Sequence, residues 1–254
     1  MQNPEKSWFG EKNVSPEEKT ENVIGVFDSV ADQYDLMNDV MSGGLHRLWK
    51  DHFIRMIRPR KTIAGRPMDY LDVAGGTGDI AFRIRKKIGA GANITLCDLN
   101  HNMLRVGRDR AIDKGWLDEF NWITGNAETL GLPDQSIDIY TIAFGLRNVT
   151  RIDTALSEAY RVLRPGGRFY CLEFSHVRPR ILAKAYDLYS YNLIPAMGER
   201  IANDRESYRY LVESIRKFPS QTALLRRMEE SGFCNARYTN LSAGIVSIHQ
   251  GTKL

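Results

Sequence analysis

A glycine-rich turn between an apolar strand and a helix constrains the fold of this chain more than any other feature. The strand pattern is Tyr70-Leu71-Asp72-Val73-Ala74, the turn is Gly75-Gly76-Thr77-Gly78-Asp79, and a helical pattern begins at Ile80. Because Gly76 and Gly78 lack a β-carbon, the backbone can turn sharply there and a ligand can lie directly against it. In α/β proteins such a turn holds a nucleotide-like cofactor.

The turn alone does not identify the cofactor. Residues 76–81 also satisfy the dinucleotide fingerprint G-x-G-x-x-A, so NAD and S-adenosylmethionine both fit. Asp98 follows at the end of the next strand pattern, where its carboxylate can accept hydrogen bonds from ribose hydroxyls. Both cofactors contain a ribose, so Asp98 leaves the choice open.

Strand and helix patterns alternate beyond about residue 65, which predicts a parallel sheet with crossover helices. Strands are expected at 68–73, 93–98, 120–124, 137–143 and 167–174, with helices between them. Ser220 caps a later helix, 221–230, after which runs 236–241 and 244–250 follow without a helix between them. These two runs should form an antiparallel hairpin. The prediction is therefore a seven-stranded α/β sheet with an antiparallel last strand.

Residues 1–65 are expected to form an N-terminal helical cap. Ser15-Pro16-Glu17-Glu18 is a capping box that starts a helix. Its apolar residues recur at helical spacing, so this face must dock on something; they are Val23, Val26, Phe27, Val30 and Tyr34. Residues 35–45, rich in Asn, Asp, Gly and Ser, should form a turn or lid, and a second helix should end at Pro59.

The second unit, residues 66–254, is expected to contain a helical insertion at 175–219. The insertion has two apolar stripes with helical spacing. One consists of Leu182, Tyr186, Tyr189 and Leu193, and the other of Tyr208, Leu211, Val212 and Ile215. Both stripes could pack on the core, or their tyrosines could line a large apolar substrate site.

Composition narrows the class of protein. The 254 residues are 43% hydrophobic and 26% charged, which is enough for one soluble domain with additions. The net charge of +4 is too small to predict nucleic-acid binding, and it fits either general solubility or contact with an anionic membrane surface. The three cysteines are far apart, which favours free thiols in a reducing compartment. No apolar run approaches the ~18 residues that span a bilayer, and no histidine spacing suggests a metal.

Residues near the third and fourth strands favour S-adenosylmethionine. The third strand ends in Gly125-Asn126-Ala127-Glu128, where a side-chain amide and a backbone amide could bind adenine. The acidic turn Leu132–Asp138 before the fourth strand is typical of S-adenosylmethionine methyltransferases. Carboxylates at Asp72, Asp79 and Asp98 would suit a sulfonium cation, although Asp72 could instead order the turn alone.

Three stretches resemble one family. They are residues 34–49 (YDLMNDVMSGGLHRLW), 143–149 (AFGLRNV) and 161–175 (RVLRPGGRFYCLEFS). All three are similar to signatures of the C-methyltransferase family of ubiquinone and menaquinone biosynthesis, and the resemblance extends from about Phe27 to Leu254.

The resemblance implies a class I S-adenosylmethionine methyltransferase with a Rossmann-like sheet. It would transfer a methyl group from S-adenosylmethionine, leaving S-adenosylhomocysteine, to a ring carbon of a polyprenylated benzoquinol or of a demethylated menaquinol. The family's cofactor contacts fall on Thr77, Asp98, Asn126 and Ala127, and a serine of some members corresponds to Ala143. With the turn residues, the expected cofactor site is Asp72, Gly76, Thr77, Gly78, Asp98, Asn126, Ala127 and Ala143.

Chemistry at the quinol would fall to residues after the fourth strand. Arg147 should stabilise a phenolate or polarise a water, since arginine does not give up its proton; pairing with an acidic residue of the lid is the alternative. Asn148 could orient the quinol oxygens. His46, Glu173 and His176 are the candidates for accepting the proton that the ring loses.

A polyprenyl tail requires a membrane surface or a partner that delivers it. Arg178, Arg180 and Lys184 could face anionic lipid, which would place the protein on the cytoplasmic side of a bacterial inner membrane. The mitochondrial matrix side is the alternative, after loss of a transit peptide. A complex of quinone-biosynthesis enzymes and a homodimer also fit. Two other functions stay open at this point: an NAD(P)-dependent oxidoreductase and a non-catalytic scaffold of such a complex.

Overall fold

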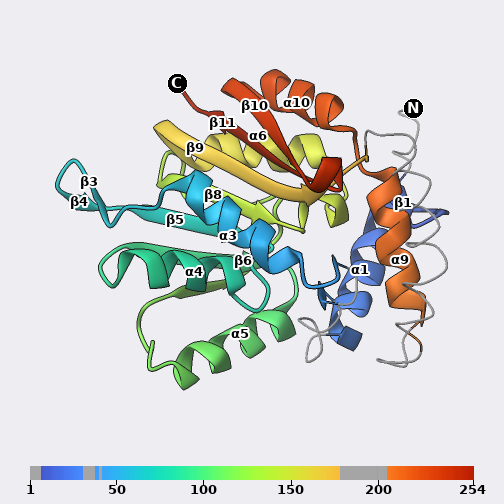
Figure 1. Ribbon diagram of the computed structural model, residues 1–254, viewed down its shortest axis with the longest axis horizontal. Coiled ribbons are helices and arrows are strands. Elements are labelled where there is room, and N and C mark those ends of the chain that lie inside the picture. The colour runs from blue at the N-terminus through green and yellow to red at the C-terminus, as the bar shows by residue number, and fades with distance from the viewer. Residues whose placement is uncertain (1–6, 31–37, 40–41, 178–198, 200–204) are drawn as a thin grey trace.

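A mixed sheet of seven strands forms the centre of the molecule (Figure 1). The computed structural model describes residues 7–30, 38–39, 42–177, 199 and 205–254. The strand order is β10-β11-β9-β8-β5-β6-β7. The strands are β5 (Asp69–Val73), β6 (Asn93–Asp98), β7 (Asn121–Thr124), β8 (Ile137–Ala143), β9 (Leu163–Phe174), β10 (Cys234–Leu241) and β11 (Val246–Thr252).

The last strand, β11, runs antiparallel to both of its neighbours, β9 and β10. β5 to β9 pair in parallel. This confirms the expected topology and the terminal hairpin. β9 begins earlier than predicted, because Pro165, Gly166 and Gly167 form an irregularity within the strand and the Gly166 amide donates to the Lys253 carbonyl (2.7 Å).

Helices cover both faces of the sheet (Figure 1). On one face are α3 (His46–Ile57), α4 (Asp79–Ile88) and α5 (His101–Asp113), and on the other are α6 (Ile152–Val162) and α10 (Gln221–Glu230). α3 packs Trp49, Phe53 and Ile57 into the core of its face, and all three are almost fully buried. The helix ends before Arg58, which adopts the left-handed conformation and is followed by Pro59.

The N-terminal segment contains two hairpins that the sequence patterns do not predict. They are β1 (Ser7–Phe9) with β2 (Lys12–Val14), and β3 (Thr62–Ile63) with β4 (Arg66–Pro67). Between them, α1 (Pro16–Val30) begins at the expected capping box: Ser15 Oγ accepts from the Glu18 amide, and Glu18 Oε2 accepts from the Ser15 amide. The division of the chain at residue 65 stays a prediction.

From the region of the insertion, α9 (Arg205–Lys217) lies beside α1 (Figure 1). Its stripe, Tyr208, Leu211, Val212 and Ile215, is buried in the core, so the packing interpretation is confirmed for this stripe. The other stripe, Leu182 to Leu193, lies outside the described residues. Two short 3₁₀ helices, η2 (Leu146–Asn148) and η4 (Ser242–Gly244), follow β8 and precede β11.

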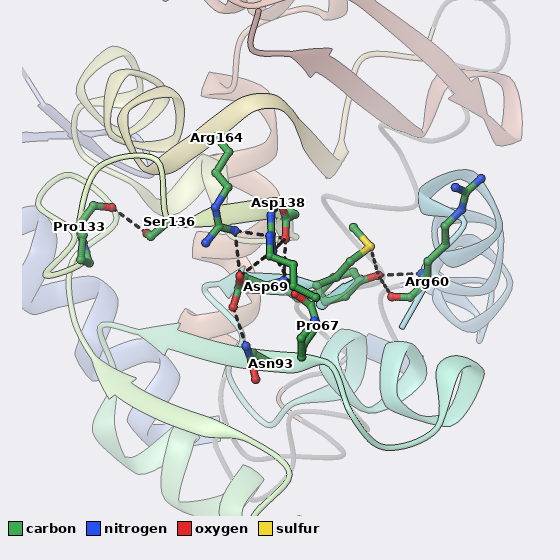
Figure 2. Close-up of polar contacts among 11 residues, drawn as sticks. Arg60, Pro67, Asp69, Asn93, Pro133, Ser136, Asp138 and Arg164 are labelled. Carbon is green, nitrogen blue, oxygen red and sulfur yellow. Dashed lines mark hydrogen bonds and ion pairs between the residues drawn. The ribbon is translucent and has the colours of Figure 1, made fainter. Parts of the chain in front are cut away.

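At the edge where the parallel strands begin, two arginines and two aspartates form an ion-pair network (Figure 2). Arg66 Nη2 lies 2.6 Å from Asp138 Oδ1, and Arg164 Nη1 lies 2.8 Å from Asp69 Oδ2. Both arginines of this network have a carboxylate partner. The other edge, where the parallel strands end, carries the glycine turn.

Candidate active site

The glycine turn has the backbone geometry that its sequence predicts. Gly76 and Gly78 have φ angles of +49° and +89°, a region that favours glycine. The Gly78 amide donates to the Gly75 carbonyl at 2.8 Å and begins α4. A β-carbon on Gly76 would lie 3.1 Å from the Met103 side chain. The turn therefore keeps bare backbone at the end of β5.

Asp98, at the end of β6, is held against this turn. Its Oδ2 accepts from the Gly76 amide and its Oδ1 from the Asn100 amide, both at 2.8 Å. Burial raises the pKa of Asp98 to about 6, and these amides oppose the rise. A carboxylate has about four lone-pair sites, so Asp98 can still accept a hydrogen bond from a ribose hydroxyl.

A pocket lies over the turn and encloses about 780 Å³, its open mouth included. Its walls come from α1 and from the loops after β5, β6, β7 and β8. They consist of Thr20, Val23, Ile24, Phe27, Val73, Ala74, Gly76, Asp98, Leu99, Asn100, Met103, Gly125, Asn126, Ala127, Glu128, Phe144, Gly145, Asn148, Val149 and Thr150.

The charge of these walls discriminates between the two cofactors. Among the described residues that line the pocket, Asp98 and Glu128 are carboxylates and none is a lysine or arginine. These carboxylates would attract the sulfonium and ammonium groups of S-adenosylmethionine, whereas they would repel a pyrophosphate, which would depend on the backbone amides of the turn alone. The charged residues that line the pocket therefore fit S-adenosylmethionine better than NAD.

The loop after β7 is preorganised by its own hydrogen bonds. Asn126 Oδ1 accepts from the Glu128 amide at 2.9 Å, which leaves the Asn126 NH₂ group as a donor. Glu128 Oε1 accepts from the amides of Thr150 and Arg151, so this carboxylate also fixes the loop before α6. Asn126 and Ala127 thus line the same pocket as Asp98, and their contact with the cofactor stays a prediction.

Helix α1 supplies a wall of the pocket that sequence reasoning missed. Lys19 Nζ donates to the Val149 carbonyl at 2.9 Å, and Asn100 Nδ2 donates to Asp28 Oδ1, also at 2.9 Å. These bonds tie α1 to the loops on two sides of the pocket. The only signal in the sequence was the apolar face of α1, whose docking site could not be named without the fold.

Four of the expected cofactor residues do not line this pocket: Asp72, Thr77, Gly78 and Ala143. Asp72 is buried within the sheet, where its Oδ1 accepts from Thr141 Oγ1 at 2.7 Å and its Oδ2 has no side-chain partner among the described residues. Burial raises the pKa of Asp72 to about 7. Asp72 therefore lies below the turn and outside the pocket lining. For all four residues, a direct contact with the cofactor stays a prediction.

Asn148 lines the pocket, but the neighbouring Arg147 does not. Arg147 Nη1 lies 2.9 Å from Glu173 Oε1, and both side chains are buried. The Arg147 backbone amide also donates to Glu173 Oε2. Burial raises the pKa of Glu173, and the charge of Arg147 opposes the rise. Arg147 is thus paired with an acid, but that acid is on β9 and not in the 35–45 segment.

The two candidate histidines are held by other contacts. His46 Nε2 donates to Asp39 Oδ1 at 2.8 Å, and its buried Nδ1 has no hydrogen-bond partner in the part of the chain that the structure describes. Burial, together with the nearby charge of Lys50, lowers the pKa of His46. His176 is exposed, and its Nε2 donates to the Phe218 carbonyl at 2.9 Å. Neither residue lines the pocket.

Within the described residues, no three His, Cys, Asp or Glu side chains come together as a metal site. In the same part of the chain, no helix has the length and apolar character needed to cross a bilayer.

Comparison with known proteins identifies the family. The profile described as the ubiE/COQ5 methyltransferase family matches residues 14–253. The chain belongs to this family. A protein of Methylobacterium nodulans is 54% identical over 97% of this chain and 96% of its own length. One of Bradyrhizobium sp. BTAi1 is 53% identical with the same coverage, and both are named ubiquinone/menaquinone biosynthesis C-methyltransferase UbiE.

Solved structures agree on the fold. A methyltransferase of Thermotoga maritima superposes with a TM-score of 0.62 at 20% identity, over 91% of this chain and 99% of its own. One of Aquifex aeolicus has a TM-score of 0.55 at 13% identity, over 95% of this chain and 100% of its own. The chain is an S-adenosylmethionine-dependent methyltransferase of class I, with a Rossmann-like α/β fold. Neither an NAD(P)-dependent oxidoreductase nor a scaffold finds support in these comparisons.

Proposed function

We propose that this enzyme methylates a ring carbon of a polyprenylated benzoquinol, and that a demethylated menaquinol is its second acceptor. The names of its relatives support a quinone precursor as the acceptor. The observation that carries the proposal is Asn148, whose carboxamide shares one pocket with Asp98 and Asn126. A polar group for the acceptor thus lies in the same pocket as the expected cofactor contacts.

S-adenosylmethionine supplies an electrophilic methyl group on a sulfonium when it is bound. A neutral aromatic carbon is a weak nucleophile. The acceptor must therefore be the reduced quinol and not the quinone, and one of its hydroxyl groups must be ionised. Asn148 would donate its NH₂ group to that oxygen, because its Oδ1 already accepts from the Tyr210 hydroxyl. Val23, Phe27 and Phe144 would keep water from the reacting atoms.

Arg147 would act on the acceptor only through its neighbour. Its charge is compensated by Glu173, and its Nη1 also donates to the Phe144 carbonyl. We assign the pair the task of fixing η2, and therefore the position of Asn148. The same pairing removes Glu173 as a convenient proton acceptor, since its oxygens are already engaged.

His46 is kept as the proposed proton acceptor for its Nδ1, which is unengaged among the described residues but is buried, on a residue outside the pocket lining. The bond from Nε2 to Asp39 fixes the tautomer and leaves a lone pair on Nδ1. Its lowered pKa keeps the ring neutral near pH 7. Lys50, one helical turn after His46, lies 6.0 Å from the ring centre of Phe144, which lines the pocket. His176 uses Nε2 for a backbone carbonyl and is the weaker choice.

Methyl transfer from radiolabelled S-adenosylmethionine to short-tailed acceptors tests this function. We expect product with the reduced demethylated benzoquinol and menaquinol, and none with the oxidised quinones. Asn148→Ala should lower kcat/KM by about tenfold or more, the cost of a hydrogen bond to a charged oxygen. Asn121→Ala, an exposed residue at the start of β7, is the matched control. Equal rates for reduced and oxidised acceptors would contradict the proposal.

The proposed role of Asp98 is tested by titrating S-adenosylhomocysteine at several pH values. Ribose hydroxyls donate to the ionised carboxylate, so affinity should weaken as the pH falls through about 6. Asp98→Asn should bind weakly and lose this dependence, while the exposed Asp109→Asn should keep it. An unchanged pH profile in Asp98→Asn would remove Asp98 from the ribose site.

Because the polyprenyl tail of the substrate is apolar, we propose that the enzyme binds peripherally to a membrane. The proposed lipid contacts are Arg178, Arg180 and Lys184. These residues lie outside the described part of the chain. Reversal of all three charges should abolish binding to vesicles that contain anionic lipid, and unchanged binding would remove the proposal. The cytoplasmic face of a bacterial inner membrane is the proposed location; a homodimer and a quinone-biosynthesis complex are further proposals, tested by sedimentation and co-purification.

A further inference from the structure

A second cavity, separate from the methyltransferase pocket, is lined by four arginines. It encloses about 1080 Å³, its open mouth included, and lies between the end of α3 and strands β9, β10 and β11. We call this cavity the arginine pocket. Its four arginines are Arg55, Arg58, Arg168 and Arg237. No residue of this cavity lines the methyltransferase pocket.

The cavity lies toward the edge of the sheet opposite the glycine turn. Arg168 is on β9, next to Ile139 near the start of β8. Arg237 is on β10, paired with Gln250 near the end of the antiparallel β11. Both positions are remote from the carboxyl ends of the parallel strands, where the methyltransferase pocket is built.

The positive charges of the arginine pocket have no acidic partner among the described residues. Arg168 Nη1 donates to the Tyr170 hydroxyl at 2.9 Å, and its guanidinium lies 5.6 Å from the centre of the Tyr170 ring. Arg237 faces the neutral carboxamide of Gln250. The ion-pair network at the same edge is different, because Arg66 and Arg164 each meet a carboxylate (Figure 2).

The Tyr170 hydroxyl cannot supply the missing negative charge. The charges of Arg168, Arg237 and Arg58 all act to lower the pKa of Tyr170, yet burial outweighs them and raises it. The phenol therefore stays neutral at physiological pH. Several guanidinium groups near one neutral hydroxyl repel one another, and a bound anion would relieve that repulsion.

Unusual backbone geometry occurs at one of these arginines and beside a second. Arg58 has φ +49° at the end of α3, where glycine is the usual residue. On β10 the pairing with β11 shifts register between Cys234 and Arg237, and Asn235 within this bulge has φ +52°. Bulges re-aim the side chains beside them, here that of Arg237 at the rim of the cavity.

We propose that the arginine pocket binds the phosphate group of an anionic ligand. The guanidinium fork matches phosphate oxygens and binds them with paired, charge-assisted hydrogen bonds. The ligand is either a free phosphate ester or the headgroup of an anionic phospholipid. The site is independent of methyl transfer and does not rest on the identity of the quinol.

Calorimetric titration of the full chain at fixed ionic strength tests the proposal with two probes. Inorganic pyrophosphate represents a free ligand, and vesicles of phosphatidic acid in phosphatidylcholine, compared with phosphatidylcholine alone, represent a headgroup. We expect the wild-type chain to bind at least one probe, and Arg237→Gln and Arg58→Gln each to weaken that binding by about tenfold or more. Pyrophosphate binding identifies a free ligand, and binding to phosphatidic acid vesicles alone identifies a headgroup.

Arg226→Gln is the matched control, because it removes one exposed positive charge from α10 on the other face of the sheet. It should bind as the wild type does. Both test residues are exposed at the rim, and unchanged thermal unfolding of the two variants would verify that they are folded. Failure of the wild-type chain to bind either probe, or an equal loss in Arg226→Gln, would overturn the proposal.

Discussion

The hydroxyl of Tyr210 donates a hydrogen bond to Asn148 Oδ1 at 3.1 Å, joining α9 to the loop after β8. Tyr210 is buried, and the ring of Phe9 stacks on it with centroids 4.2 Å apart. Burial raises the pKa of Tyr210 far above its usual value, so the phenol remains a donor at physiological pH. The bond decides which end of the Asn148 carboxamide is left for a ligand.

Tyr210→Phe should therefore reduce kcat for methyl transfer by about fivefold, which corresponds to the loss of one neutral hydrogen bond. The dissociation constant of S-adenosylhomocysteine should not change, because the lost bond orients only Asn148. Tyr160→Phe is the control, since the Tyr160 hydroxyl donates no hydrogen bond to a described residue. Equal effects of the two substitutions on kcat would contradict the assignment.

The buried pair of Arg147 and Glu173 should behave as one unit in stability measurements. Arg147→Met leaves Glu173 without its partner, and breaking a buried pair in this way costs about 3–5 kcal/mol of unfolding free energy. The double variant Arg147→Met, Glu173→Gln should lose much less than the sum of the two single losses. Urea denaturation of all four proteins measures this coupling, and strictly additive losses would mean that the pair is not coupled.

Asp72 should make the stability of the enzyme depend on pH. Its pKa rises from 3.8 to about 7 on folding, so its stabilising contribution is complete below about pH 4 and is lost as the pH rises toward 7. Asp72→Asn does not titrate, and its unfolding free energy should exceed that of the wild type by up to about 4 kcal/mol at pH 8 but not at pH 4.

Urea denaturation at pH 4, 6 and 8 measures this difference. Asp113→Asn, which changes an exposed carboxylate at the end of α5, should show no such trend. A constant difference between Asp72→Asn and the wild type across the three pH values would show that Asp72 does not titrate as described.

The fold followed from local patterns, because strand-like and helix-like stretches alternate along the chain and turn residues separate them. Ser15 and Ser220 were correctly identified as helix caps from residues within one turn of each. The hairpins at 7–14 and 62–67 were not predicted, because strands of two or three residues are too short to show an alternation. Their stability depends on contacts with distant segments, such as the stacking of Phe9 on Tyr210.

The pocket was predicted in part. Gly76, Asp98, Asn126 and Asn148 follow the carboxyl ends of neighbouring strands, and the parallel topology brings such residues together. The partner of Arg147 could not be predicted, because Glu173 reaches it only through the pairing of β8 with β9. Strand pairing also places Asp72 beside Thr141 of β8, inside the sheet. The sequence alone therefore did not show that Asp72 lies outside the pocket lining.

Lys19 explains how α1 comes to cover the pocket, and it yields the last prediction. Its ammonium group is buried against the Val149 carbonyl. Burial lowers the pKa of Lys19 to about 8, and the charge of Glu128 opposes that change. Lys19 is therefore charged at pH 7 and becomes neutral as the pH rises through about 8, which weakens a charge-assisted bond between α1 and the loop after η2.

Lys19→Met keeps an unbranched side chain, one atom shorter than that of lysine, but removes this bond. Bound S-adenosylhomocysteine should then dissociate about tenfold faster at pH 7, the loss expected for one charged hydrogen bond, and amides of residues 16–30 should exchange faster with solvent. Lys87→Met, on an exposed turn of α4, should change neither rate. In the wild type, dissociation should accelerate between pH 7 and 9, and in Lys19→Met it should not. A pH dependence that survives in Lys19→Met would mean that another group controls the release, because the side chain that titrates near pH 8 in this wall would already be gone.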